Sequence, residues 1–184
     1  GDILIGGEGA DFIAGAGGTD TIDGGHGGDI LSGQAGADVI TGAEGDDLID
    51  GGLGDDYLSG GDGADVIAGG QGDDIAVFAG NQSDYTFASS PDGLTVTVTE
   101  VSTGYADTVS GVETLRFDDG DIAVSQDANG LLLTGSAGSD VLTGDDAANV
   151  LTGNDGDDVF YGRGGDDTYI GGDGTDTADY SAAA

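Results

Sequence analysis

The sequence Gly-Gly-Glu-Gly-Ala-Asp-Phe-Ile-Ala at 6–14 is the first of eight consecutive nine-residue copies, which continue without a gap to residue 77. The second copy, at 15–23, is Gly-Ala-Gly-Gly-Thr-Asp-Thr-Ile-Asp. We number the nine places of each copy from its first residue. In all eight copies places one and four are Gly, place six is Asp, and place eight is Ile or Leu, except for Ala76 in the last copy. Self-similarity at a fixed short period is typical of repeat architectures.

The composition narrows the class of protein and of partner. The 184 residues include 41 Gly, one Pro and no Cys, and because Gly does not fall at every third position, a collagen helix is excluded. There are 37 acidic residues against two basic ones, a net charge of −35. This charge argues against nucleic acid and anionic membranes as partners and favours cations. Without Cys, disulfides, thiolate metal sites and Cys nucleophiles are excluded.

Neither a membrane-spanning segment nor a signal peptide is visible in the sequence. No run of about 18 apolar residues occurs, so we expect no membrane insertion, and no charged segment followed by an apolar core marks a signal peptide. The chain begins within a copy, because Asp2-Ile3-Leu4-Ile5 fits places six to nine. We therefore expect an excerpt of a longer protein.

The period also predicts local structure. Gly at places one and four, and often at two, allows the positive φ angles of a tight turn, whereas places seven to nine are apolar or β-branched and predict a short strand. Because side chains alternate along a strand, place eight points inward and places seven and nine point outward. Two consecutive copies then form one coil with two opposed strands, and stacked coils pair in parallel. Since parallel crossovers are right-handed, we predict an all-β fold, a right-handed parallel β-roll.

The pattern Gly-Gly-x-Gly-x-Asp-x-(apolar)-x resembles the nonapeptide of the RTX, or haemolysin-type calcium-binding repeat, family. The resemblance covers residues 6–77 and, after an interruption, five further copies at 135–179. In that family the copies form a calcium-loaded parallel β-roll, usually in proteins exported by the type I system. The resemblance thus implies a fragment of a secreted, extracellular protein.

The sixth-place Asp residues are the candidate metal ligands. They recur on one edge of the roll about 4.8 Å apart, where two carboxylates repel by about 3.5 kcal/mol at an effective dielectric of 20. A cation between successive coils turns the repulsion between the carboxylates into a net attraction. Carboxylates with backbone carbonyls suit Ca²⁺ better than the smaller Mg²⁺. Pairing each copy with the next but one predicts about nine ions, six in the first block and three in the second. The predicted ligands are Asp11, Asp20, Asp29, Asp38, Asp47, Asp56, Asp65, Asp74, Asp140, Asn149, Asp158, Asp167 and Asp176, with carbonyls of turn residues such as Gly7, Gly9, Gly25 and Gly27.

One copy departs from the pattern. The copy at 144–152 has Ala147 at place four and Asn149 at place six, which removes one charge and puts a side chain where a positive φ is expected. We expect the site of Asn149 with Asp167 to be the weakest, or empty.

Place seven predicts an outward apolar row on one side of the first block. We define this stripe as Phe12, Ile30, Leu48 and Val66. It could pack on the intervening segment, bind a partner or pair with another roll, and plain strand propensity is the alternative explanation. Our hypothesis is that part of the stripe is covered by other protein.

We expect three regions: a roll block at 1–77, an antiparallel β insert or cap at 78–134, and a second roll block at 135–184. Strands are predicted in the insert at 85–88, 94–99, 108–112, 114–117 and 121–124, with turns at 91–93 and 118–120. Its stretch 111–120, Gly-Val-Glu-Thr-Leu-Arg-Phe-Asp-Asp-Gly, resembles inserts that accompany RTX repeats. Capping the roll is the expected role, and a carbohydrate-binding module using Tyr85 and Tyr105 is the alternative.

No catalytic motif occurs, so this segment is not expected to be an enzyme, although its parent protein could be one. The predicted function is a calcium-binding module that folds in extracellular calcium and supports type I secretion and the stability of a larger protein. The alternatives are an adhesin or matrix module with a cell-surface or glycan partner, and the non-catalytic tail of a secreted hydrolase or epimerase. The expected partners are calcium ions and the rest of the parent chain.

Overall fold

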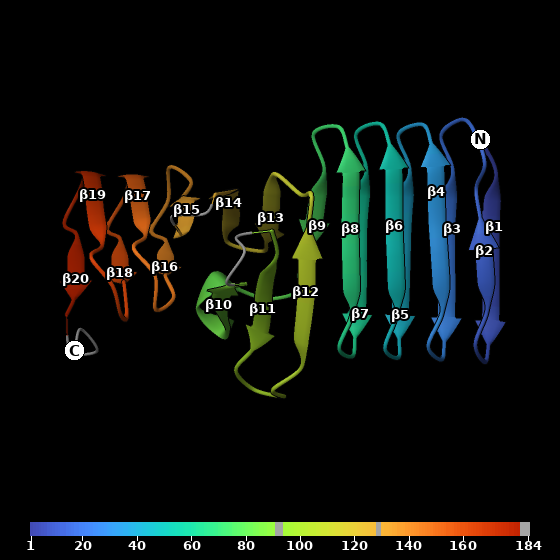
Figure 1. Ribbon diagram of the computed structural model, residues 1–184, viewed down its shortest axis with the longest axis horizontal. Coiled ribbons are helices and arrows are strands. Elements are labelled where there is room, and N and C mark those ends of the chain that lie inside the picture. The colour runs from blue at the N-terminus through green and yellow to red at the C-terminus, as the bar shows by residue number, and fades with distance from the viewer. Residues whose placement is uncertain (91–93, 128–129, 181–184) are drawn as a thin grey trace.

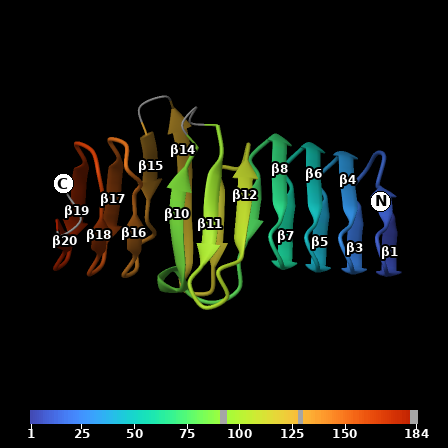
Figure 2. The same ribbon diagram turned by 60° about the horizontal axis from the view of Figure 1, so that its bottom comes forward.

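The computed structural model describes residues 1–90, 94–127 and 130–180 of the chain. It is an elongated β-solenoid whose strands stack along one axis (Figures 1 and 2). Within these ranges there is one short 3₁₀ helix, η1 (Gln82–Asp84), and no helix is long and apolar enough to cross a membrane. The predicted all-β fold with parallel β-roll blocks is confirmed.

In the first block, alternate strands form two parallel sheets. One sheet contains β1 (Ile3–Glu8), β3 (Thr21–His26), β5 (Val39–Glu44), β7 (Tyr57–Asp62) and β9 (Ile75–Val77). The other contains β2 (Phe12–Ala14), β4 (Ile30–Ala35), β6 (Leu48–Leu53) and β8 (Val66–Gln71). Each residue pairs with the one two copies later, as in Ile22 opposite Ile40, so two nonapeptides make one coil.

Most strands of the first block are longer than predicted and also include places one to three, as in β3 and β4. The prediction of strands at places seven to nine alone is wrong because places one to three also pair with the next coil, as in Gly7 opposite Gly25 and Glu8 opposite His26. The residue at place two pairs with the next coil while having a positive φ, 101° at Gly25 and 74° at Gln34. The residue at place four also has a positive φ, such as 117° at Gly27, and forms the turn. Place one does not have a positive φ, so its glycine needs another explanation.

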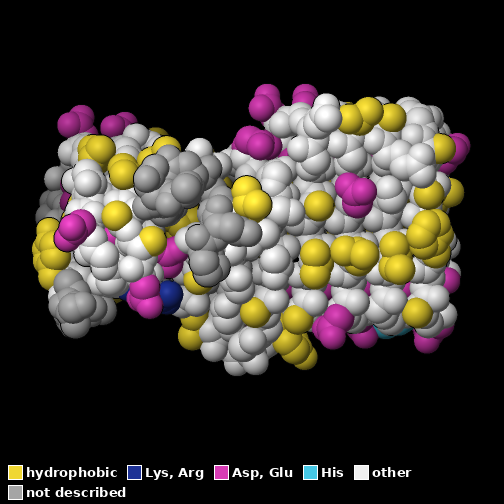
Figure 3. Space-filling view, in the orientation of Figure 1, with side chains coloured by type: hydrophobic (Ala, Val, Ile, Leu, Met, Phe, Trp, Pro, Cys, Tyr) yellow, Lys and Arg dark blue, Asp and Glu magenta, His cyan; other side chains and the backbone are white. Residues whose placement is uncertain are grey.

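The side-chain alternation is confirmed. Place-eight side chains fill the space between the two sheets, and from the second copy on they are at most 1% exposed: Ile22, Leu31, Ile40, Ile49, Leu58, Ile67 and Ala76. Burial of each larger side chain contributes roughly 1.5 to 3 kcal/mol. The stripe lies outside, with Phe12 75% exposed and Ile30, Leu48 and Val66 each 45% exposed. Figure 3 shows it as a row of hydrophobic side chains across β2, β4, β6 and β8.

The segment between the blocks is antiparallel, as predicted. It contains β10 (Tyr85–Ser89), β11 (Val96–Glu100), β12 (Ala106–Ser110), β13 (Thr114–Phe117), β14 (Gly120–Asp127) and β15 (Gly130–Thr134). The five predicted strands are present, the one at 114–117 with the predicted ends and the other four with shifted ends. Strand β15 was not predicted, and residues 118–119 form the predicted turn between β13 and β14. The turn predicted at 91–93 lies outside the described residues.

This segment joins the two blocks into one sheet. Strand β12 pairs in parallel with β8, and β13 with β9, which covers the strand edges where the first block ends. Strands β13, β14 and β15 then pair antiparallel, and β15 pairs in parallel with β17 (Val150–Asp155) of the second block. A ten-stranded sheet therefore runs from β1 to β19 (Thr168–Asp173). Strands β10, β11 and β12 extend the other sheet of the first block beyond β8. A separate three-stranded sheet contains β16 (Val141–Thr143), β18 (Val159–Tyr161) and β20 (Thr177–Asp179).

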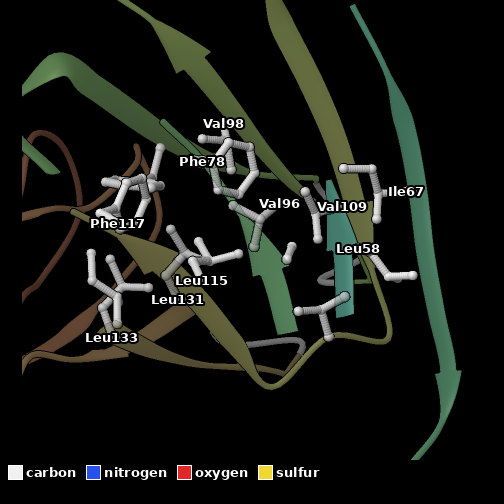
Figure 4. Packing of buried hydrophobic residues seen from close by; sticks show 14 of the residues in the cluster. Leu58, Ile67, Phe78, Val96, Val98, Val109, Leu115, Phe117, Leu131 and Leu133 are labelled. Atoms are coloured by element: carbon white, nitrogen blue, oxygen red, sulfur yellow. The ribbon is translucent and has the colours of Figure 1, made fainter. Parts of the chain in front are cut away.

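The hydrophobic core is continuous through this junction. Figure 4 shows Leu58 and Ile67 of the roll followed by Val109, Leu115 and Leu131 of the intervening segment, all at most 3% exposed. Aromatic rings then widen the core: Phe78, Tyr85, Phe87 and Phe117 contact one another with ring centroids 5.3 to 6.0 Å apart.

Candidate metal sites between stacked turns

The sixth-place Asp residues form two ladders, one on each edge of the first block. In each ladder the backbone N–H of one Asp donates to Oδ1 of the sixth-place Asp in the next coil. Asp11 donates to Asp29 at 2.8 Å, and Asp38 donates to Asp56 at 2.8 Å. The predicted stacking of sixth-place residues two copies apart is thus present in the fold, through Oδ1 and a backbone amide.

The second carboxylate oxygen has no protein partner. From Asp20 to Asp74 these side chains are at most 2% exposed, yet each Oδ2 is buried without a hydrogen bond. Nine such oxygens lie in the part of the chain that the structure describes: Oδ2 of Asp11, Asp20, Asp29, Asp38, Asp47, Asp56, Asp65, Asp74 and Asp158. Leaving a buried charged group unpaired costs more than about 1 to 3 kcal/mol, so a periodic row of them indicates a ligand.

Burial also perturbs the acidity of these groups. It raises the pKa of Asp47 to about 6, against the lowering effect of its hydrogen bond from Asp29, and the carboxylates of Asp65 and Asp29 raise it further. Burial likewise raises the pKa of Asp74 to about 6. The pKa values of Asp56 and Asp65 are raised for the same leading reason. These four buried carboxyls therefore disfavour their ionised form, and a bound cation would favour it.

Glycine at place one keeps space around these oxygens. A Cβ built on Gly51 would lie less than 3.0 Å from both Oδ2 of Asp56 and the carbonyl oxygen of Gly69. The same pair of atoms, the Asp Oδ2 of the same copy and the place-one carbonyl of the next coil, surrounds Gly6, Gly24, Gly33 and Gly42. Carboxylate and carbonyl oxygens thus converge at each turn, and they are the ligands that calcium prefers.

The carbonyls predicted as ligands belong to residues at places two and four of the turns. The carbonyl oxygens of Gly7 and Gly9 lie over Gly25 and Gly27 of the next coil. The place-one carbonyls beside Oδ2, such as those of Gly24 and Gly69, were not singled out from the sequence. Across residues 1–90, 94–127 and 130–180, no three acidic, His or Cys side chains converge on one metal position.

The second block departs from this pattern at its first copy. Oδ1 of Asp140 accepts a hydrogen bond from Nε2 of the buried Gln82 at 2.9 Å. Its Oδ2 accepts from the backbone N–H of Ser136 at 2.8 Å and from the Ser136 hydroxyl at 3.2 Å. Both carboxylate oxygens of Asp140 therefore have protein hydrogen-bond donors, whereas Oδ2 has none in the first block.

The copy with Asn149 departs further. Nδ2 of Asn149 lies within hydrogen-bond distance of the carbonyl oxygens of Asp145 (3.2 Å), Ala147 (2.8 Å) and Gly162 (3.4 Å) and of Oδ1 of Asp167 (3.0 Å), which share its two N–H donors. The amide group occupies the centre of a ring of oxygens. The expected backbone strain is wrong, because Ala147 does not have a positive φ.

Asp145 holds this irregular turn in place. It accepts hydrogen bonds from the backbone N–H of Ala147 at 2.8 Å and from the backbone N–H and hydroxyl of Ser89. Burial would raise the pKa of Asp145, but these hydrogen bonds lower it below its ordinary value. Asp145 thus ties the turn to β10, in addition to the hydrogen bonds that join it to the next copy.

The last three predicted ligands, Asp158, Asp167 and Asp176, differ in burial and in the partners of Oδ2. Asp158 keeps the pattern of the first block: it is buried, its Oδ2 has no partner, and its N–H donates to Oδ1 of Asp176 at 3.2 Å. Oδ2 of Asp167 accepts from the Tyr169 hydroxyl at 3.4 Å, and Asp176 is exposed.

Sequence reasoning missed two carboxylates in the intervening segment. The N–H of Asp65 donates to Oδ1 of Asp107 at 2.8 Å, and the N–H of Asp74 donates to Oε2 of Glu113 at 2.9 Å. A signal was present, because the residues from Asp107 to Gly111 (Asp-Thr-Val-Ser-Gly) repeat places six to nine and the following place one. The irregular spacing concealed it.

Comparison with known proteins identifies the repeat by its sequence. The family model of the RTX calcium-binding nonapeptide repeat (4 copies) matches residues 1–31, 23–58, 42–76, 50–85, 132–156 and 143–178. No curated protein matches the chain. The extracellular lipase LipA from Serratia marcescens has a similar crystal structure, with 26% identity over 87% of this chain and 28% of that chain, and a TM-score of 0.34.

A second solved structure is the solution structure of the AlgE6R3 subunit from the Azotobacter vinelandii mannuronan C5-epimerase. It shows 25% identity over 58% of this chain and 73% of that chain, with a TM-score of 0.22. The present chain spans only 28% of the lipase chain. Because the family model matches most of the sequence, the chain belongs to the family of RTX calcium-binding nonapeptide repeats.

Proposed function

We propose that this chain is a calcium-binding folding module whose first block becomes stable when Ca²⁺ enters the two Asp ladders. The row of buried Oδ2 atoms without protein partners carries the proposal, since a folded chain without cations would leave them all unsatisfied. The perturbed acidity of Asp47 and Asp74 supports it.

The sites we propose in the first block lie between sixth-place Asp residues of successive coils. Each would use Oδ2 of the earlier Asp and the place-one carbonyl of the next coil, as in Asp56 with Gly69. Six pairs fit: Asp11–Asp29, Asp29–Asp47, Asp47–Asp65, Asp20–Asp38, Asp38–Asp56 and Asp56–Asp74. In the second block we propose one such site, Asp158 with Asp176, and none at Asn149.

Folding and binding are coupled in this proposal. A bound calcium ion supplies the positive charge that two facing carboxylates lack. Without it, the net charge of −35 and the 41 Gly favour an expanded chain. Because the ladders exist only in the folded roll, extracellular calcium stabilises the fold by linkage. Export by the type I system in an unfolded state, followed by folding outside the cell, would use this switch.

We further propose that the segment itself is not catalytic and that 1–77, 78–134 and 135–184 are its three regions, within a longer secreted protein. A second function, presentation of a binding surface as in an adhesin, is favoured by one observation. The stripe stays 45 to 75% exposed, and the intervening segment extends the sheet beside it without covering it.

The test is a calcium titration of the chain followed by circular dichroism, with magnesium as control and calorimetry to count ions. We expect a cooperative transition from coil to β structure near millimolar calcium, absent with magnesium, and saturation near seven to nine ions. A chain that is fully β-structured in excess chelator at pH 7.5 would overturn the switch. Binding to cells or glycans that exceeds the effect of folding would favour the adhesin function.

A further inference from the structure

Two of the unpartnered oxygens in the first block remain after all pairs of nonapeptides have been formed. The six pairs use Oδ2 of the Asp residues from Asp11 to Asp56. Asp65 and Asp74, the last of each ladder, have no nonapeptide in the next coil, because the repeats stop at residue 77. Both are at most 1% exposed, and each Oδ2 is buried without a partner.

Asp107 takes the next position in the ladder of Asp65. Its Oδ1 accepts the Asp65 N–H at 2.8 Å, as Asp65 accepts that of Asp47. The backbone N–H of Thr108 donates to the Asp65 carbonyl at 2.8 Å, the same bond that Val66 makes with Asp47. Asp107 is only 8% exposed. This part of the intervening segment is a coil of the roll that the repeat pattern does not reveal.

Glu113 takes the same position in the other ladder. Its Oε2 accepts the Asp74 N–H at 2.9 Å, and Leu115 lies opposite Ala76 in the place-eight register. A Cβ built on Gly69 would lie less than 3.0 Å from both Oδ2 of Asp74 and the carbonyl oxygen of Gly111. Gly111 thus supplies the carbonyl that a place-one glycine supplies elsewhere.

We propose that Asp107 with Asp65, and Glu113 with Asp74 and the Gly111 carbonyl, form two further calcium sites at the junction between the first block and the intervening segment. The proposal rests on the proposed function, because the site of Asp65 uses the same pairing of stacked carboxylates, and the site of Asp74 adds a carbonyl oxygen as in the first block. It assigns to the intervening segment a ligand role that no nonapeptide match covers, since the matched ranges end at 85 and resume at 132.

These sites join regions that are far apart in sequence. Asp65 and Asp107 are separated by 42 residues, and Asp74 and Glu113 by 39. Filling the two sites therefore closes the loops that contain β10 and β11 and fixes β12 and β13 on the open edges of β8 and β9. Calcium then controls attachment of the intervening segment as well as stacking of the nonapeptides.

The experiment compares the wild-type chain with Asp107→Asn, Glu113→Gln and the double variant. Both substitutions keep an oxygen that can accept the Asp65 or Asp74 N–H, and remove only the charge. Asp50→Asn is the matched control, because Asp50 is an exposed carboxylate of β6 at place nine. By calorimetry at saturating calcium we expect one ion fewer in each single variant, two fewer in the double variant, and no loss in the control.

Hydrogen exchange gives a second measurement. Calcium should slow exchange of the Thr108 and Thr114 amides, which bond to the carbonyls of Asp65 and Asp74, by at least tenfold in the wild type and less than twofold in the double variant. The Val66 amide, bonded to Asp47, should stay protected in both. An unchanged ion count with unchanged protection in the double variant overturns this proposal alone. Absence of calcium binding by the wild type overturns the proposed function and this proposal with it.

Discussion

Asp29 and Asp47 lie one coil apart and use the two oxygens of their carboxylates for different purposes. The backbone N–H of Asp29 donates to Oδ1 of Asp47 at 2.8 Å, whereas Oδ2 of each residue is buried with no hydrogen-bond partner. One oxygen therefore fixes the stacking of the coils, and the other is left for a ligand. The two roles can be separated by mutation.

Asp47→Asn should keep the stacking bond and remove a calcium ligand. Its Oδ1 can still accept the Asp29 N–H, so we expect a folded roll in calcium that binds at least one ion fewer by calorimetry. An ion present at 100 times its Kd stabilises a fold by about 2.7 kcal/mol, so stability in calcium, measured by urea unfolding, should fall by about that amount.

Asp46→Asn is the control for the loss of charge. Asp46 is the exposed neighbour at place five, and its Oδ1 accepts the N–H of Ala64 at 2.9 Å, a bond that Asn can also accept. We expect its ion count to equal that of the wild type. Equal ion counts in Asp46→Asn and Asp47→Asn would contradict the assignment of Oδ2 as a ligand.

The pH dependence of the calcium-free chain should be opposite to ordinary acid denaturation. Burial raises the pKa of Asp47 and Asp74 from 3.8 to about 6 in the folded state. A raised pKa means that the folded state binds protons more tightly, so its contribution is fully present below pH 3.8 and is lost as pH rises through 6. In excess chelator, β structure should therefore increase between pH 7.5 and pH 5.

Circular dichroism in excess chelator between pH 7.5 and pH 5 tests whether β structure increases as the pH falls. In calcium, acidification should instead reduce β structure, since protons compete with the ion for the same carboxylates. The apparent affinity for calcium should therefore fall below pH 6. Replacing both Asp47 and Asp74 with Asn should reduce the pH response in chelator. Loss of β structure on acidification through pH 6 without calcium would show that these carboxyls are not protonated in the fold.

Gly51→Ala tests the space at place one. Its new Cβ would lie less than 3.0 Å from Oδ2 of Asp56 and the Gly69 carbonyl, so it should displace ligand oxygens at one site. We expect one ion fewer and a higher calcium concentration at the folding midpoint. Gly17→Ala is the matched control, because its Cβ would meet only the Ala35 carbonyl, at 3.9 Å, and should leave both quantities unchanged. Equal midpoints for the two variants would rule out a role for place one in binding.

The two roll blocks could be predicted from the sequence because the nine-residue period determines their side-chain alternation and strand pairing. The alternation of buried place eight and exposed place seven, and the pairing of residues two copies apart, follow from geometry that every copy shares. The strand lengths could not be predicted the same way. Places one to three look like turn residues, and only the pairing of neighbouring coils, as in Gly7 with Gly25, makes them strand.

The candidate sites were predictable only as far as the period continued. Asp107 and Glu113 lie at non-periodic distances from Asp65 and Asp74, since the loops between them have irregular lengths, so pattern matching misses them. Gln82 is harder still to find from sequence: it is a neutral residue 58 positions from Asp140, and only the packing of η1 against the second block brings them together. The departure at Asn149 was visible in sequence, but the ring of oxygens around its amide was not.

Asn149→Asp should convert a calcium-independent turn into a calcium-dependent one. In the wild type, three carbonyl oxygens and Oδ1 of Asp167 share the two N–H donors of the Asn149 amide, so we expect the turn to need no ion. A carboxylate at position 149 would have no N–H to donate to those oxygens. Their loss of a hydrogen-bond donor should destabilise the second block by about 1 to 3 kcal/mol in chelator. In calcium the same oxygens become ligands, and the variant should bind one ion more than the wild type. Asn154→Asp is the control, because Nδ2 of Asn154 also donates to a carbonyl, that of Gly135 at 2.7 Å, but to no sixth-place carboxylate. Calorimetry at pH 7.5 that shows a gained ion in Asn149→Asp and none in Asn154→Asp would establish that the amide replaces a cation, and an equal count in both would refute it.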